Sequence, residues 1–152
     1  MSILSQDVLS NFCQEARGLP TSAHMAVIKT WTNGWATSQR FHESRKLKCI
    51  FGCDEGDCLN HYLQCDILWP LLLSVRRAHT PALNSNPAER AAICNISRWS
   101  ICNLWVAFQV YHSLKIGRRD LVDSALTPGD YSSTGDALLD LLSVIASEIP
   151  GG

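Results

Sequence analysis

Hydrophobic positions along most of the chain recur at intervals of three and four residues, as they do on one face of an α-helix. Residues 4–17 fit a first amphipathic helix closed by Gly18, and a second helix runs from a cap at Thr21 or Ser22 to about Thr32. No run of alternating apolar and polar residues is long enough to predict a strand. The pattern therefore predicts an all-α fold, a helical bundle.

Proline and capping residues mark where later helices begin. Pro70 suits the first turn of a helix that starts near Ile67. Asn86, followed by a proline, is a helix-start signal, and the apolar residues after it recur at helical spacing up to Gly117. This predicted helix, residues 87–116, is apolar over more than one stripe, so we expect it to be buried on most sides, in the fold or against a partner.

The length and composition of the chain fit one ordinary domain. It has 152 residues, of which 46% are hydrophobic, enough to bury a core without a metal or disulfides. A last amphipathic helix is expected between Leu138 and Ile149. Because no internal repeat divides the chain, we expect residues 1–152 to form a single helical domain.

The charge balance excludes a protein-wide electrostatic field. Lys and Arg number 13 and Asp and Glu number 14, so the net charge is −1. No stretch approaches the ~20 apolar residues that span a bilayer, and the N-terminal segment lacks the features of a secretory signal. We therefore expect no membrane association and a reducing intracellular compartment, where clustered cysteines serve as metal ligands more often than as disulfides.

The richest chemistry lies in residues 49–65, which contain four of the seven cysteines and one histidine. The spacing C-x3-C-x7-H-x3-C offers three sulfurs and one imidazole, a set that suits tetrahedral Zn²⁺ and leaves no position open for a reacting water. The four residues are Cys49, Cys53, His61 and Cys65. We therefore expect a small loop stapled by a structural zinc ion.

Two features of this segment bear on the ligand set. Cys58 would share a helical face with His61 and Cys65 and is a rival ligand, ranked below Cys49 because Cys49 and Cys53 form a self-contained loop pair. The acidic residues among the cysteines argue against a simple core cluster, because carboxylates do not belong in a core. They are Asp54, Glu55 and Asp57.

The segment Lys29–Trp69 carries a Trp-containing helix, a Thr-x-x-Arg pair at Thr37 and Arg40, the C-x3-C pair, the run HYLQC and a Leu-Trp pair. It resembles the zinc-binding region that follows the polymerase domain in reverse transcriptases of non-LTR retrotransposons. The resemblance implies the same four zinc ligands and a nucleic-acid-binding role. Because the sequence shows neither the paired polymerase aspartates nor a complete nuclease site, it also implies a terminal module detached from the polymerase.

The connector of residues 40–48 is a local basic stretch in a nearly neutral chain. Four cations stand against Glu43 alone, a local charge of 4 − 1 = +3 with the histidine neutral. The cations are Arg40, Arg45, Lys46 and Lys48. We expect this connector to contact RNA or another single-stranded nucleic acid, with Trp35 stacking on a base, whereas Trp31 and Trp69 are expected to bury against the zinc loop.

No residue pair in the sequence suggests a nucleophile and its base, so we expect a protein that is not an enzyme. The alternative function is a structural subunit of a larger protein or ribonucleoprotein, with zinc as a fold staple and the 87–116 helix docking on protein partners or self-associating. The pI of about 6.5 favours this alternative, because dedicated nucleic-acid domains usually exceed a pI of about 9.

Overall fold

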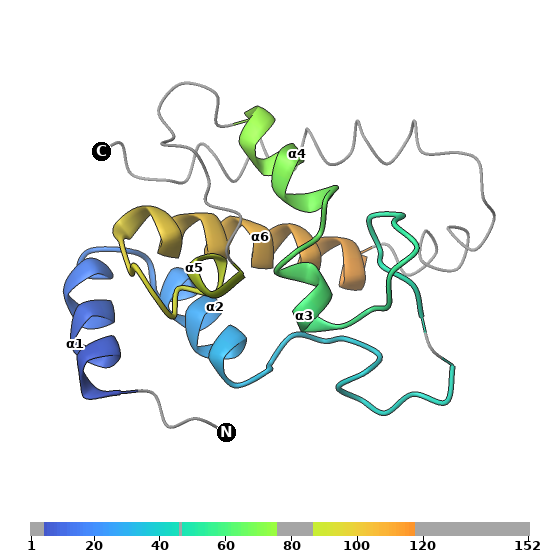
Figure 1. The fold of residues 1–152 in the computed structure, drawn as a ribbon, viewed down its shortest axis with the longest axis horizontal. Helices are drawn as coiled ribbons and strands as arrows, with labels where there is room; N and C mark the ends of the chain where they lie inside the picture. Colours follow the sequence, from blue (N-terminus) through green and yellow to red (C-terminus); the bar gives the residue numbers. More distant parts are fainter. Residues whose placement is uncertain (1–4, 46, 76–86, 118–152) are drawn as a thin grey trace.

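The computed structural model describes residues 5–45, 47–75 and 87–117, and in these ranges the protein is helical (Figure 1). The helices are α1 (Gln6–Glu15), α2 (Thr21–Trp31), α3 (Leu59–Tyr62), α4 (Leu68–Val75), α5 (Pro87–Arg90) and α6 (Arg98–Gly117). The same ranges contain no β-strand, only an isolated antiparallel bridge between Lys48 and Gly56. The all-α prediction is confirmed.

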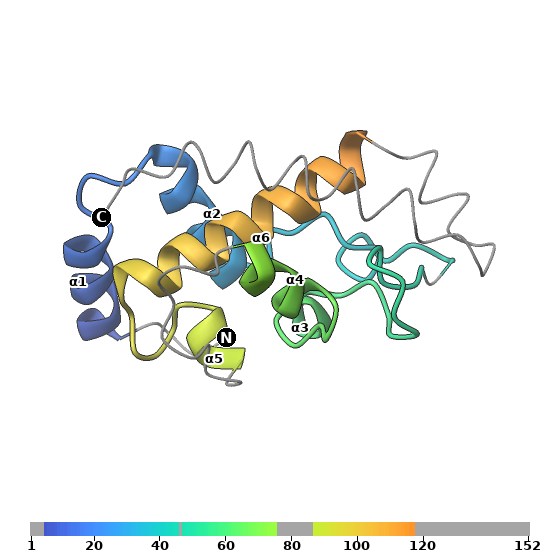
Figure 2. The same ribbon diagram turned by 90° about the horizontal axis from the view of Figure 1, so that it is seen from above.

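Helix α6 is the central element of the fold. It has 20 residues, which makes it about 30 Å long, and α2, α4 and α5 all pack against it (Figures 1 and 2). Its buried side chains cover most of its circumference: Ile101, Cys102, Leu104, Trp105, Val106, Ala107, Phe108, Val110, Tyr111 and Leu114. The predicted burial of an apolar helix on most sides is confirmed, and it does not in itself require a second chain.

The single long helix predicted over residues 87–116 is wrong. Helix α5 ends at Arg90, and the backbone then turns through the left-handed region at Ala92 and Asn95 (φ 52° and 48°) before α6 begins. The new start is capped by two serines, since the backbone N–H of Ser100 donates to the Ser97 hydroxyl (3.1 Å) and that of Ser97 to the Ser100 hydroxyl (2.9 Å). These serines divide the segment into two helices.

Helices α1 and α2 follow the sequence pattern closely. The Ser5 hydroxyl caps α1 by accepting from the backbone N–H of Val8 (3.3 Å), and α2 begins at Thr21, with Pro20 at its N-cap position rather than a threonine or serine. At the end of α2, a Cβ on Gly34 would lie 3.0 Å from the carbonyl oxygen of Lys29, so the turn there needs glycine. The predicted break at this position is confirmed.

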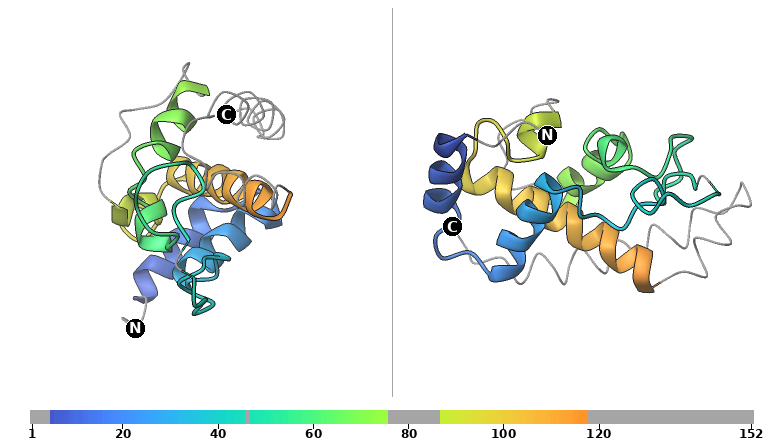
Figure 3. Two further views of the ribbon diagram at one scale, coloured as in Figure 1. Left: turned by 90° about the vertical axis from the view of Figure 1, so that its right-hand side faces the viewer. Right: turned by 90° about the horizontal axis from the view of Figure 1, so that it is seen from below.

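Helix α6 runs from the region of α1 to the loop that precedes α3 (Figure 3). Near its first residue, the backbone N–H of Arg98 donates to the Glu15 carboxylate (3.0 Å) and the Arg98 guanidinium to the carbonyl of Arg17 (2.9 Å). Near its last turn, Lys115 reaches Asp57, beside the cysteine cluster. The helix therefore ties the cysteine-bearing loop to the rest of the core.

Several predictions fall outside the described ranges. These are the cap at Asn86, the cation Lys46 and the last helix between Leu138 and Ile149. The predicted helix near Ile67 is confirmed as α4, with Pro70 in its first turn. In the described parts of the chain, no helix has both the length and the apolar character needed to cross a membrane.

Candidate metal centre

A tight hairpin places Cys49 and Cys53. The backbone N–H of Cys49 donates to the carbonyl of Glu55 (2.8 Å), next to the bridge between Lys48 and Gly56, and the N–H of Gly52 returns to the carbonyl of Cys49 (3.1 Å). Gly52 has a φ of 90°, a conformation that side chains other than glycine rarely adopt. The turn therefore brings the two sulfurs to one side.

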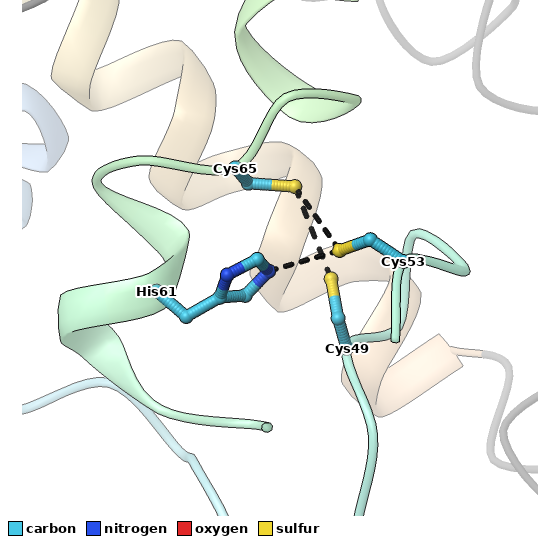
Figure 4. Close-up of side chains that lie close together, drawn as sticks. All are labelled: Cys49, Cys53, His61 and Cys65. Carbon is cyan, nitrogen blue, oxygen red and sulfur yellow. Dashed lines mark hydrogen bonds between the residues drawn. The ribbon is translucent and has the colours of Figure 1, made fainter. Parts of the chain in front are cut away.

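The short helix α3 supplies the other half of the cluster. His61 lies within α3, and Cys65 lies three residues after the end of this helix. Cys58 is the N-cap residue of α3. The spacing of four residues directs the side chains of His61 and Cys65 toward the hairpin (Figure 4). The donor atoms of two separate segments thus converge.

The four donor atoms all lie within 4.8 Å of one another. The Sγ of Cys65 is 3.9 Å from that of Cys49 and 3.8 Å from that of Cys53, and the Cys53 Sγ is 3.0 Å from the Nε2 of His61 (Figure 4). Cys49 and Cys65 are buried, whereas Cys53 and His61 are partly exposed. These residues form a candidate metal site that is open on one side.

The two sulfur–sulfur distances fit a tetrahedral zinc ion. Zn–S bonds of about 2.3 Å at tetrahedral angles place two sulfurs about 3.8 Å apart, which matches both sulfur–sulfur distances. The same geometry requires about 3.6 Å between a sulfur and an imidazole nitrogen, so Cys53 and His61 must spread by roughly half an ångström. The cluster is thus consistent with zinc.

Backbone N–H groups support the two buried sulfurs. The N–H of Phe51 donates to the Sγ of Cys49 (3.4 Å), and that of Leu68 donates to the Sγ of Cys65 (3.4 Å). Such contacts orient metal ligands and stabilise the thiolate form. Because Leu68 is the first residue of α4, Cys65 is held by the same helix start that buries Trp69.

The three cysteine sulfurs also shift one another's pKa values. A hydrogen bond from the Cys49 thiol lowers the pKa of Cys65 to about 5. Hydrogen bonding to the Cys65 sulfur, and then burial, raises the pKa of Cys49, and burial raises that of Cys53. Three thiolates this close would repel one another, so all three could ionise together only around a bound cation.

Cys58 is not part of this cluster. The group of four donors found in the described residues comprises Cys49, Cys53, His61 and Cys65 without it. Its N-cap position in α3 turns it to a cavity of about 390 Å³ that it shares with Cys53 and His61, on the open side of the site. The ranking of Cys49 above Cys58 therefore agrees with the geometry.

Asp57 corrects one sequence argument, because this carboxylate is in the core. It is 2% exposed and accepts hydrogen bonds from the backbone N–H of Ser38 (2.7 Å), the hydroxyl of Tyr62 (2.6 Å) and the ammonium of Lys115 (2.6 Å). Burial is tolerated because three donors replace water. Asp54 and Glu55, by contrast, are exposed as expected.

Tyr62 links this network to the metal site. Its hydroxyl donates to Asp57 and also accepts from the backbone N–H of Ile50 (3.3 Å), inside the hairpin between the first two cysteines. Burial, and then the charge of Asp57, raises the pKa of Tyr62. No sequence pattern indicates this network, because Lys115 and Asp57 are far apart along the chain and share no motif.

The prediction that Trp35 stacks on a base is wrong. Its side chain is 0% exposed, packs on Tyr62 and Tyr111, and donates its indole N–H to the hydroxyl of Thr30 (2.9 Å). The Asn33–Gly34 turn folds this tryptophan back against α2 and α6, so its large apolar surface completes the core. It is not accessible to a nucleic acid.

The other two tryptophans near the cluster differ from each other. Trp69 is buried and donates to the carbonyl of Tyr62 (2.9 Å), beside the cysteine loop as expected. Trp31 instead lies against Phe12 and donates to the carbonyl of Ala91 (3.0 Å), away from that loop. Only Trp69 therefore supports the candidate metal centre.

The basic residues of the connector differ in exposure and in ion pairing. Arg40 and Arg45 are exposed, and Lys48 forms an ion pair with Asp54 (2.7 Å) that holds the pKa of this carboxyl below its usual value. Lys46 lies outside the described residues. The basic surface therefore centres on Arg40 and Arg45, with the charge of Lys48 partly offset.

No protein-family model, curated protein or solved structure matches the chain. The likeness to reverse-transcriptase termini therefore remains a prediction that rests on the residues from Lys29 to Trp69.

Proposed function

We propose that the chain is a non-catalytic zinc-binding module that contacts RNA or another single-stranded nucleic acid, derived from the terminus of a retroelement reverse transcriptase. The observation that carries the zinc part is the convergence of three sulfurs and one imidazole at distances that suit a tetrahedral ion. Four protein donors fill the coordination shell, which favours a structural role over a catalytic one.

The nucleic-acid part rests on the connector. Arg40 and Arg45 are exposed, and the chain just before the connector is held to the metal hairpin by the bond from the Ser38 N–H to the Asp57 carboxylate. The cations are thus presented from a fixed base, which lowers the entropic cost of a phosphate contact. The near-neutral total charge means that any binding must be local, weak and sensitive to salt.

The affinity for labelled single-stranded RNA, measured at several salt concentrations, tests the nucleic-acid role of the connector. Each neutralised phosphate contributes about −0.7 to the slope of log affinity against log salt, so Arg40→Gln with Arg45→Gln should flatten the slope by about 1.4. The matched control is Arg17→Gln, which removes an exposed cation just after α1. Absence of binding at low salt, or equal effects of the two variants, contradicts a nucleic-acid role.

A structural-subunit role is the second candidate, and exposed apolar side chains favour it. Met25 and Ile28 lie one turn apart on α2 and are 42% and 41% exposed, and Trp99 and Ile93, in the 87–116 segment, are also exposed. Such side chains suit protein partners or self-association. Light scattering after size exclusion tests self-association, and a monodisperse monomer at all concentrations would argue against it.

A further inference from the structure

A second cavity lies between the connector and the metal hairpin, and none of the four candidate metal ligands lines it. Its volume is about 430 Å³, within the range of about 300 to 1,000 Å³ that small-molecule sites occupy. The connector contributes His42, Glu43 and Leu47 to its wall, Gln39 adds to this wall from just before the connector, and the hairpin contributes Asp57. The cavity is therefore built where the basic connector meets the metal loop.

Backbone hydrogen bonds fix the shape of this cavity. The N–H of Gln39 donates to the carbonyl of Asp57 (3.4 Å), and the N–H of Asp57 donates to the carbonyl of Leu47 (2.9 Å). The N–H of Glu43, in the connector, donates to the carbonyl of Ser38, just before the connector (3.1 Å). The connector wall and the hairpin wall are thus held together in the absence of a ligand. Such preorganisation favours binding, because less conformational entropy is lost when the ligand binds.

The wall carries polar side chains that are open to a ligand. Asp57 is already occupied by its three donors, so the floor of the cavity is not a free negative charge. Gln39, His42 and Glu43 are exposed, and no hydrogen bond within the described ranges engages their side chains. An amide, an imidazole and a carboxylate on one wall can together pair with the edge of a planar heterocycle.

One feature of the connector, an exposed aromatic ring, points to a planar base as the ligand. Phe41, between two residues of the cavity wall, is 56% exposed, and the Arg40 guanidinium lies 5.1 Å from its ring centroid. An exposed aromatic ring beside a cation is suited to stacking on bases while the cation contacts phosphate.

We propose that this cavity binds one unstacked nucleobase of a single-stranded nucleic acid, with Phe41 stacking on an adjacent base and Glu43 accepting a hydrogen bond from an exocyclic amino group. The proposal rests on the nucleic-acid role above and specifies it. Because Glu43 accepts and does not donate, cytosine, which carries such an amino group, is preferred over uracil, which carries a carbonyl there.

The test compares the binding of two 12-nucleotide RNAs, all-cytidine and all-uridine, to the zinc-loaded full chain. We expect the wild type to bind the cytidine RNA about tenfold tighter, because a hydrogen bond to a charged group is at stake. Glu43→Gln should reduce this ratio to near one. Phe41→Ala should weaken both RNAs roughly tenfold through lost stacking, whereas Phe41→Tyr should retain wild-type affinity.

Control measurements separate this inference from the function on which it rests. Ile28→Ala removes an exposed apolar side chain from α2 and should leave both affinities unchanged. Wild-type binding that is salt-dependent but equal for the two RNAs, and unaffected by Phe41→Ala, overturns the cavity assignment and leaves the basic connector as the contact. No binding of either RNA at low salt overturns both.

Discussion

The Nζ of Lys115 lies 2.6 Å from the Oδ2 of Asp57, and this ion pair joins the last turn of α6 to the hairpin that carries Cys49 and Cys53. The Asp57 side chain is fully buried, and that of Lys115 is 15% exposed. A buried pair of this kind adds less stability than its Coulomb energy suggests, but it fixes how the metal loop sits on the core.

Replacement of Lys115 by Met should destabilise the protein by about 3 kcal/mol, because it leaves the Asp57 carboxylate buried without its cation. The free energy of unfolding from urea titration, with zinc present, measures the effect. The double variant with Asp57→Asn should recover part of the loss, since the uncompensated charge is then gone.

The matched control is Lys48→Met, which breaks the exposed pair with Asp54 at nearly the same distance (2.7 Å). Since solvent screens this pair, we expect no measurable change in unfolding. Equal effects of the Lys48 and Lys115 variants would contradict the view that burial makes the Asp57 pair important.

Tyr62 and Tyr111 offer a second matched comparison, because both are buried and their rings are in contact. Tyr62→Phe removes a donor from Asp57 and should cost about 2 kcal/mol. The hydroxyl of Tyr111 has no hydrogen-bond partner among the described residues, so Tyr111→Phe should be neutral or stabilise by up to about 1 kcal/mol. A larger loss for Tyr111 than for Tyr62, measured by urea unfolding, would contradict the network.

The sequence predicted what depends on local pattern. Helices α1 and α2, the Asn33–Gly34 turn and the start of α4 follow from periodicity and turn residues, which act within a few positions. The candidate metal site was also predictable, because all four of its donors lie in residues 49–65 and their spacing alone suggests convergence.

Two of the errors, at Trp35 and Asp57, share one physical cause, which is that tertiary contacts decide burial. The sequence around Trp35 does not predict its burial, yet this side chain is buried because Phe108 of α6 packs against it. Asp57 is buried because Lys115, far along the chain, supplies its cation. The break before α6 did have a local signal, the Ser97-x-x-Ser100 capping pair, but the apolar periodicity through residues 93–96 masked it.

Metal content tests the ligand set. We expect one zinc per chain in the purified protein and in Cys58→Ser, and far less in Cys65→Ser, whose buried sulfur lies within 3.9 Å of both other thiols of the site. Elemental analysis after dialysis against a weak chelator gives the stoichiometry. Retention of zinc by Cys65→Ser together with its loss from Cys58→Ser would show that the sulfurs are wrongly assigned.

Removal of the metal should loosen the cysteine loop without unfolding the helical body. Acid should release zinc, because protons compete for the three thiolates and the imidazole, so affinity falls as pH falls. The core that α6 forms with α2 contains Val27, Trp105 and Phe108, none of which belongs to the metal site, and it buries enough apolar surface to persist. We therefore expect a strong chelator at neutral pH to leave most of the far-ultraviolet helical signal intact while hydrogen exchange accelerates in residues 47–65.

Protein that has lost its zinc in acid should regain zinc and exchange protection when neutral pH and metal are restored. Cooperative loss of the entire helical signal on chelation would mean that zinc, rather than the apolar contacts of α6, determines whether the chain folds.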